Sequence, residues 1–407
     1  MHTRTRSAVS KIFVLVAITI ALSSSGWAQA TEKILYSFTG SADGGYPQSG
    51  LAIDSKGNLF GATQDGGSAA TCSCGTVFEL SPGSNGTWTE SVIHSFSATN
   101  GDGNNPFGQP VFDSKGNLYG TTLFGGANFQ GTVYELSPGA NGTWSESVLY
   151  NFTGGADGGS IYTSRLTIDS SGNLYGVANS GGTYGFGVVF ELSPGSNGTW
   201  TEKVLHSFTG GDDGGNPYAS SVVLDSSGNL YGMARGGGAH DYGVVFDLTP
   251  QSNGTWSEKV IYDFPGGASG AYPIGGLFLG SSGKLYGAAY DVFELVPGSN
   301  GMRTKKTVHS FTGTPDGAFP EAALISDKAG NLYGTTNSGG AHNGTVFELM
   351  PGPNGNWKER VLHRFSGGAD GVSPNWSPLA MDASGNLYGT TQTGGASNVG
   401  VVFEVTP

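Results

Sequence analysis

The chain is 407 residues long, enough for one large domain or two smaller ones, and carries 72 glycines but only 12% charged residues. So much glycine without a three-residue period indicates a chain with many turns and excludes a collagen-like one. The formal net charge is −13 at pH 7, which argues against nucleic acid as a partner because nucleic acid is itself strongly negative.

The first thirty residues have the pattern of a secretory signal peptide. Arg4, Arg6 and Lys11 flank the start of an apolar run over residues 12–22, and Ala28-Gln29-Ala30 offers a cleavage site after Ala30. The run is shorter than the roughly 20 residues that a spanning helix needs. We therefore expect a secreted or periplasmic protein with no membrane span after cleavage, and a formal charge that moves from −13 to −16 as three basic residues are lost.

Two cysteines follow early in the mature chain, Cys72 and Cys74, separated by one residue in a segment that reads as a loop. Outside the cytoplasm such a pair is expected to close a small local disulfide. A metal site is the alternative, but it would need further ligands, and the neighbouring sequence has none.

A four-residue phrase, Asn-Leu-Tyr-Gly at residues 117–120, recurs along the chain and defines a repeat. Before each copy stands a short apolar run that ends in Asp and a Gly/Asn-containing turn, a combination typical of a hairpin between a first and a second strand. The seven copies begin at Asn58, Asn117, Asn173, Asn229, Lys284, Asn331 and Asn386.

A third and a fourth strand complete each repeat. The third, as at residues 131–137, follows a Gly-Gly loop and is apolar on both faces apart from one acid. A Pro-Gly-x-Asn-Gly turn then leads to a fourth strand, as at residues 88–96. Four short antiparallel strands packed face to face in radial series predict a β-propeller.

The position at which the repeat is cut predicts a closed ring. The mature chain begins with a lone fourth strand at residues 34–38 and ends with a third strand at residues 400–405 that has no fourth strand after it. The N-terminal strand can therefore complete the last blade and leave no edge unpaired. The prediction is all-β: one seven-bladed propeller domain over residues 31–407, with four antiparallel strands per blade, and we expect a monomer.

The sequence motifs of the repeat resemble those of a known family. Asn-Leu-Tyr-Gly-Thr-Thr at 117–122, Gly-Thr-Val-Phe-Glu-Leu at 344–349 and Val-Leu-His-Ser-Phe at 204–208 are similar to the Gloeo/Verruco (GloVer) tandem repeat, over essentially residues 31–407. The resemblance implies an extracytoplasmic repeat protein, and it implies no particular activity.

The two ends of such a ring differ. By analogy with closed propellers of this strand order, the first strand is innermost, so the stereotyped turns between first and second and between third and fourth strands lie at one end, the turn end. The loops before each first strand and after each second strand form the other end, the loop face. These loops vary in length and content, and variable loops on a rigid scaffold are where binding usually resides.

Six of the loops before the first strands carry an aspartate. A ring of carboxylates around a channel mouth could hold Ca²⁺ or a cationic ligand. The alternative is structural, because each precedes Gly and the Asp-Gly pair commonly bonds its own turn. The residues are Asp43, Asp102, Asp157, Asp213, Asp316 and Asp370, and Ser269 stands at the equivalent position of the fifth blade.

The same seven loops each carry an aromatic residue. Exposed rings would suit stacking on sugars, whereas the alternative is that the rings cap the blade interfaces and are buried. The seven are Tyr46, Phe107, Tyr162, Tyr218, Tyr272, Phe319 and Trp376.

A site for one ligand has to break a sevenfold repeat, so off-pattern residues are further candidates. Arg165 and Glu321 introduce charge before a first strand, and Arg235 follows a second strand. If they face one another across the channel they suit a carboxylated or polar ligand, and the alternative is drift at exposed positions.

Two other sevenfold sets are expected to be structural. The acids of the third strands should accept hydrogen bonds, since a catalytic pair is not repeated seven times. In the fourth strands His and Tyr interchange, which indicates a need for a ring with a polar tip. The two sets are Glu79, Glu135, Glu191, Asp247, Glu294, Glu348 and Glu404, and Tyr36, His94, Tyr150, His206, Tyr262, His309 and His363.

No catalytic residue is assigned, because no combination of nucleophile, base and orienting group is evident. The leading hypothesis is a binding module for a carbohydrate or a protein partner, acting through the loop face. A glycan hydrolase or lyase is the first alternative, although Glu321 is the single off-pattern carboxylate that could serve it. A passive structural protein of the envelope is the second.

Overall fold

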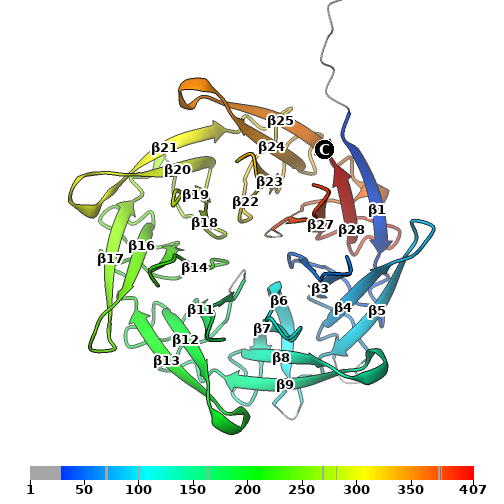
Figure 1. Cartoon of the computed structure of the whole chain (residues 1–407), viewed down its shortest axis with the longest axis horizontal. Helices are drawn as coiled ribbons and strands as arrows, with labels where there is room; N and C mark the ends of the chain where they lie inside the picture. Colours follow the sequence, from blue (N-terminus) through cyan, green and yellow to red (C-terminus); the bar gives the residue numbers. More distant parts are fainter. Residues whose placement is uncertain are drawn as a thin grey trace, which may run out of the picture.

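A computed structural model of the protein describes residues 29–68, 72–99, 101–162, 165–267, 270–280, 282–374, 376 and 378–407. The predicted signal peptide, except for Gln29 and Ala30, lies outside these residues. The described chain forms seven four-stranded antiparallel sheets arranged in a ring about a central axis (Figure 1). The predicted seven-bladed propeller is therefore confirmed. Within the described ranges, no helix combines the length and apolar character needed to cross a membrane.

The two inner strands of each blade are short except in blade 2, where they have ten and eight residues. Blade 1 comprises β2 to β5, blade 2 β6 to β9, and so on to blade 7, which comprises β26 to β28 and β1. The innermost strands are β2 (Ala52–Ile53), β6 (Gly103–Phe112), β10 (Thr167–Ile168), β14 (Val223–Leu224), β18 (Phe278–Leu279), β22 (Ile325–Ser326) and β26 (Ala380–Met381). The second strands are β3 (Leu59–Thr63), β7 (Leu118–Gly125), β11 (Leu174–Ala178), β15 (Leu230–Ala234), β19 (Leu285–Ala288), β23 (Leu332–Thr336) and β27 (Leu387–Thr391).

Outside blade 2 the two outer strands of each blade are longer than the inner ones, and short 3-10 turns accompany several of them. The third strands are β4 (Thr76–Pro82), β8 (Thr132–Pro138), β12 (Val188–Pro194), β16 (Val244–Pro250), β20 (Asp291–Pro297), β24 (Thr345–Pro351) and β28 (Val401–Thr406). The outermost strands are β5 (Trp88–Ser95), β9 (Trp144–Asn151), β13 (Trp200–Ser207), β17 (Trp256–Asp263), β21 (Arg303–Ser310), β25 (Trp357–Arg364) and β1 (Thr31–Ser37). The 3-10 turns are η1 (Ala140–Gly142), η2 (Ser196–Gly198), η4 (Ser299–Gly301), η5 (Pro353–Gly355) and η6 (Gly368–Asp370).

The glycine of each Asn-Leu-Tyr-Gly phrase makes room for an aromatic ring of the third strand. A Cβ added to Gly176 would lie 2.5 Å from Cζ of Phe190, which is far inside van der Waals contact. The same overlap would occur in all seven blades, so the glycine is required by packing and not by its backbone angles. The glycines are Gly61, Gly120, Gly176, Gly232, Gly287, Gly334 and Gly389.

The tyrosine of the phrase joins neighbouring blades. Tyr119 of blade 2 packs edge-on against Trp200 of blade 3 with ring centroids 6.1 Å apart, and Tyr175 meets Trp256 in the same way at 6.4 Å. In blade 5 an arginine replaces the tryptophan, and the guanidinium of Arg303 lies 5.5 Å from the centroid of the Tyr231 ring. These contacts lie near the turn end and repeat the same interface around the ring.

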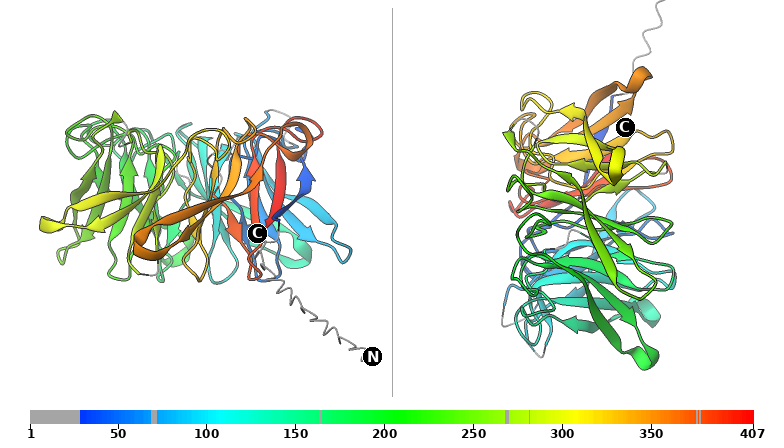
Figure 2. Two further views of the ribbon diagram at one scale, coloured as in Figure 1. Left: turned by 90° about the horizontal axis from the view of Figure 1, so that it is seen from above. Right: turned by 90° about the vertical axis from the view of Figure 1, so that its left-hand side faces the viewer.

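The ring is closed by the N-terminal strand. β1 pairs antiparallel with β28, from Thr31 opposite Thr406 to Ser37 opposite Val401. Phe38 follows β1, is fully buried, and packs against Phe78 of blade 1 with ring centroids 5.1 Å apart. Figure 2 shows the resulting thick ring from the side, with the blade strands running between its two faces. The predicted split of the last blade is therefore confirmed.

The predicted structural residues have the expected partners. Glu135 of a third strand accepts a hydrogen bond from Ser137 at 2.8 Å, and Glu348 forms an ion pair with Arg360 at 2.8 Å between Oε2 and Nε. Cys72 and Cys74 are joined as a local disulfide. These contacts belong to the scaffold.

Candidate functional site

The six loop aspartates hold their own loops. Asp157, for example, accepts hydrogen bonds from the backbone N–H of Thr153 at 2.8 Å and from the Tyr150 hydroxyl at 3.1 Å. Tyr150 belongs to the outermost strand β9, so the carboxylate lies at the outer part of the ring and not at the channel mouth. The expectation of a carboxylate ring around the mouth is therefore corrected: each Asp is drawn toward the tyrosine or histidine of the strand that precedes its loop.

One left-handed residue in each of these loops fixes the loop between two blades. Tyr46, with φ 54°, donates its N–H to the Val399 carbonyl of blade 7 at 2.7 Å, and its own carbonyl accepts from the Gln64 N–H of blade 1 at 3.2 Å. A bulky residue adopts such a φ only when surrounding contacts enforce it. The corresponding residues are Tyr46, Asn105, Ser160, Asn216, Tyr272, Phe319 and Ser373, with φ between 49° and 57°.

Four of the seven predicted aromatic rings meet over the central channel. The ring centroids of Tyr162 and Tyr218 are 4.6 Å apart, those of Phe107 and Tyr162 are 5.5 Å apart, and Trp376 lies 6.0 Å from Phe107 and 6.2 Å from Tyr218. Because these rings come from blades 2, 3, 4 and 7, Trp376 must reach across the axis. The four rings together form the central aromatic cluster.

The other three predicted aromatics lie around this cluster. Tyr46 is half-buried, whereas Tyr272 and Phe319 keep 43% and 47% of their surface exposed. Neither alternative offered by the sequence therefore holds for the whole set. Part of it is packed into the mouth, and part of it is available to a ligand.

Arg235 extends the central aromatic cluster toward the exposed rings. Its guanidinium carbon lies 5.7 Å from the centroid of the Tyr218 ring and 5.7 Å from that of Tyr272, so it lies within cation–π range of both. Tyr218 belongs to the cluster and Tyr272 is exposed, so the arginine joins a packed region to an open one. Its planar guanidinium offers several N–H donors to a ligand.

Glu321 is the acidic member of the same region. It accepts a hydrogen bond from Asn337 Nδ2 at 3.1 Å. Burial raises its pKa, and this effect is only partly offset by the Asn337 hydrogen bond and by the positive charge of Arg235. The structure thus brings Glu321 under the electrostatic influence of Arg235.

Arg165 lies elsewhere. It lines a channel cavity of about 400 Å³ together with Gln109, Phe278 and the residues of several inner strands. Arg165 is exposed to the water of the channel, but the protein atoms packed around its guanidinium partly desolvate it and so lower its pKa. Two of the three predicted off-pattern residues, Arg235 and Glu321, therefore share the mouth, and Arg165 marks the channel wall.

The sequence interpretation missed a set of polar residues directly after the second strands. Gln64 accepts a hydrogen bond from Gln48 at 2.8 Å, and the Asn179 carbonyl accepts from Asn216 at 3.1 Å. Each occupies the position that Arg235 and Asn337 occupy in their own blades. Position relative to the Asn-Leu-Tyr-Gly phrase was the available signal, because residues six places after its first member lie at one level of the ring.

Further exposed aromatics on the loop face were also missed. Among the described residues, the seven exposed Phe and Tyr side chains all lie on this face. Two are Tyr272 and Phe319, and Phe124 lies near the end of the second strand β7. The others follow second strands and are Phe129, Tyr184, Phe186 and Tyr290. The loop face therefore carries far more exposed ring surface than the turn end.

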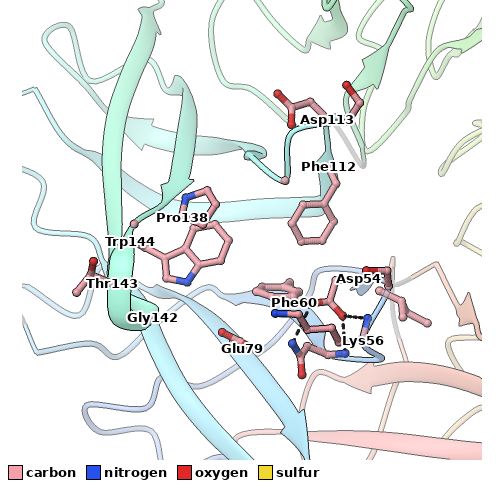
Figure 3. A pocket seen from close by; sticks show the side chains of 16 residues that line it. Asp54, Lys56, Phe60, Glu79, Phe112, Asp113, Pro138, Gly142, Thr143 and Trp144 are labelled. Atoms are coloured by element: carbon pink, nitrogen blue, oxygen red, sulfur yellow. Dashed lines mark hydrogen bonds between the residues drawn. The ribbon is translucent and has the colours of Figure 1, made fainter.

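The turn end has larger cavities, but the aspartates that line them are bonded to their own turns. Figure 3 shows a cavity of about 620 Å³ between blades 1 and 2, lined by Asp54, Phe60, Phe112 and Trp144 among others. A second of about 1010 Å³ lies over the turns of blades 5 to 7 and includes Asp382. Their aspartates are engaged in their own turns, as when Asp54 accepts from the N–H groups of Lys56 and Asn58 at 2.8 and 2.9 Å.

The fold and this face define the class: a seven-bladed propeller of tandem repeats whose irregular loops present aromatic, basic and amide side chains at one end. Comparison with known families then shows that the chain belongs to the Gloeobacter/Verrucomicrobia repeat family, which it matches at residues 24–159, 70–293 and 291–407. The family resemblance inferred from the repeat motifs is confirmed. A search of curated proteins finds no match.

Two solved structures from B. thetaiotaomicron are similar in fold. One is an extracellular domain assigned to a hybrid two component system, with 14% identity and a TM-score of 0.54, and the other is an extracellular domain assigned to a one component system, with 12% identity and a TM-score of 0.56. Both alignments cover 93% of this chain but only 41% and 42% of those chains. The chain thus spans about two fifths of their length, and the likeness concerns the fold.

Proposed function

We propose that this protein is an extracytoplasmic binding module that holds a carbohydrate chain on its loop face. The observation that carries the proposal is the gathering of exposed aromatic rings there, beside Arg235 and Glu321. The signal-peptide pattern of residues 1–30 supports a location outside the cytoplasm, as does the similarity to two extracellular domains.

The chemistry of the face suits a sugar. The C–H faces of a pyranose pack on rings such as Tyr272 and Phe319, which are rigid and only half covered by protein. The hydroxyl groups of a sugar need donors and acceptors, and Arg235, Asn337 and Glu321 supply both kinds. The rings are spread over several loops and not gathered into a closed pocket, which favours a chain of several sugar units over a single one.

The arrangement around Glu321 favours binding over hydrolysis. The common glycosidases use two carboxyl groups separated by roughly 5 to 9.5 Å on either side of the bond that is cleaved. Burial raises the pKa of Glu321, and the hydrogen bond from Asn337 and the charge of Arg235 stabilise its carboxylate form. A carboxylate held by an amide beside an arginine is instead well placed to accept hydrogen bonds from hydroxyl groups.

A glycan array followed by calorimetry tests the proposal. The mature protein is screened, and a retained oligosaccharide is titrated into the wild type and into Tyr272→Ala and Arg235→Ala. We expect each variant to lose about tenfold or more in affinity, as buried aromatic and arginine anchors usually do. Met302→Ala is the matched control, because Met302 is similarly exposed, at 42%, but lies at the turn end.

Three results would contradict the proposal. The first is an array with no retained glycan, which would leave a protein partner as the better hypothesis for the same face. The second is unchanged affinity in both variants. The third is release of shorter sugars from a bound polysaccharide, which would make the protein a glycan-active enzyme.

A further inference from the structure

The outer junctions between blades repeat one arrangement of polar groups. In most blades the ring of an outermost strand, the aspartate of the loop that follows it and a glutamate on the outermost strand of the next blade come together. The glutamates are Glu32, Glu90, Glu146, Glu202, Glu258 and Glu359, and the Oε1 atom of each is buried with no hydrogen-bond partner among the described residues. The junction between blades 1 and 2 departs from this arrangement in a way that matters.

At the junction between blades 1 and 2, the loop that leads from the outermost strand to the aspartate is one residue longer than in the other blades. In most blades the aspartate accepts from the N–H of the residue four places earlier, as Asp157 does from Thr153. Asp102 instead accepts from the N–H and hydroxyl of Ser97, five places earlier, at 2.7 and 2.9 Å, and both bonds use Oδ2. The other oxygen, Oδ1, accepts from the Gly103 N–H at 2.7 Å and is turned toward His94.

Three potential ligand atoms therefore face one another at this junction. His94 Nε2 and Asp102 Oδ1 are 3.6 Å apart, too far for a hydrogen bond but suited to two ligands of one ion. The ligand atoms of His94, Asp102 and Glu146 lie within 4.8 Å of one another. His94 Nε2 and Glu146 Oε1 are both buried, and neither has a hydrogen-bond partner within the described ranges.

The junction between blades 4 and 5 shows how the fold treats the same position when it carries its own cation. There the sequence has Ser269 in place of the aspartate and Lys305 in place of the glutamate. Lys305 Nζ lies 2.7 Å from Asp291 Oδ2, and the two side chains are only 6% and 8% exposed. Asp291 is the first residue of the third strand β20 of the same blade, at a position where the other third strands have Thr or Val. The lysine that replaces the junction glutamate is thus paired with an acid of its own blade.

We propose that His94, Asp102 and Glu146 bind one divalent transition-metal ion of the zinc type, linking the outermost strands of blades 1 and 2. One imidazole and two carboxylates are a ligand set that Zn²⁺ accepts, with solvent completing the coordination. Ca²⁺ is disfavoured because it takes six to eight oxygen ligands, and one of the three groups here is a nitrogen.

Zinc titration of the mature protein, purified without a polyhistidine tag and freed of metal with EDTA, tests the site. We expect one equivalent of Zn²⁺ to bind and to raise the melting temperature, and about a hundredfold excess of Ca²⁺ not to displace it. His94→Phe and Glu146→Gln should each weaken Zn²⁺ binding about tenfold or more. Their circular dichroism in EDTA reports whether they still fold.

The junction between blades 3 and 4 supplies the matched control. There His206 Nε2 lies 3.1 Å from Asp213 Oδ2, so the two groups bond each other directly. His206→Phe and Glu258→Gln should leave Zn²⁺ binding unchanged. Absence of saturable binding, retention of the affinity in folded His94→Phe, an equal loss in His206→Phe, or displacement by Ca²⁺ would each overturn the proposal.

Discussion

The turn end and the loop face use the same repeat in opposite ways. At the turn end six blades carry an aspartate that accepts from the N–H of the residues two and four places later, with little change in distance. At the loop face the position six places after the first residue of each Asn-Leu-Tyr-Gly phrase varies between amide, apolar, basic and aromatic side chains. The residues there are Gln64, Leu123, Asn179, Arg235, Tyr290, Asn337 and Gln392. Repetition therefore encodes packing, and chemistry is found where the repetition fails.

The largest expected contrast between scaffold and loop face concerns two phenylalanines. Phe38→Ala removes a fully buried ring beside the strand that closes the propeller, so we expect the free energy of unfolding to fall by about 3 to 5 kcal/mol. Phe129→Ala removes a ring that is 69% exposed on the loop face, so the free energy of unfolding should change by less than about 0.5 kcal/mol. Denaturant unfolding measures both, and similar losses in the two variants would break the comparison.

A smaller contrast is expected between two glycines of blade 4. A Cβ at Gly232 would lie 2.3 Å from Cζ of Phe246, so Gly232→Ala should cost about 1 to 3 kcal/mol through overpacking. A Cβ at Gly236, on the loop face, would meet nothing closer than 3.5 Å. Gly236→Ala should therefore be tolerated. Thermal unfolding of both variants checks this, and a tolerated Gly232→Ala would refute the packing role of the repeated glycine.

At the turn end, Asp382→Ala should cost about 1 kcal/mol or less at neutral pH, because the carboxylate accepts hydrogen bonds from the turn. Burial raises the pKa of Asp382, but the hydrogen bonds from Asn386, Tyr388 and Ser384 outweigh it and lower the pKa overall. A lowered folded pKa gives stability above the unfolded pKa that is lost as pH falls. The difference between variant and wild type should therefore shrink below about pH 4, and a constant difference would contradict this.

The smallest expected effect concerns Glu202 at the outer junction of blades 2 and 3. Burial first, and the charge of Asp157 second, raise its pKa to about 7. The folded state then holds a proton that the unfolded chain releases from about pH 4.5, so stability contributed by protonated Glu202 is lost as pH rises from there to about 7. Tyr150, the ring at this junction, does not titrate in that window, because burial raises the pKa of its phenol above the usual value.

Glu202→Gln isolates this effect because glutamine stays uncharged. The melting temperature of the variant relative to the wild type should rise between pH 4.5 and 7 and stay level above it, by a few degrees at most because the group is only half-buried. A flat or falling difference would show that the carboxylate is not held protonated at this junction.

The candidate site was predictable in part. The sequence placed Tyr218 and Trp376 in corresponding loops, but only the ring geometry shows that both reach the axis, since one residue of shift along a loop redirects a side chain. Arg165 and Glu321 both precede a first strand, yet one faces the channel wall and the other the mouth. The loop aspartates could not be placed inside or outside the ring from sequence, because an Asp-Gly turn is compatible with either direction.

The sequence by itself determined the number of blades, the order of strands and the closure of the ring. These follow from a local phrase repeated seven times and from the position of its cut, both of which are properties of the chain read in order. Only the tertiary structure decided which side chains meet. The contacts of Trp376 with Phe107 and of Arg235 with Tyr272 join different blades, and such distances are set by the radius and twist of the assembled ring. The same holds for His94, Asp102 and Glu146, which face one another only after two blades pack side by side.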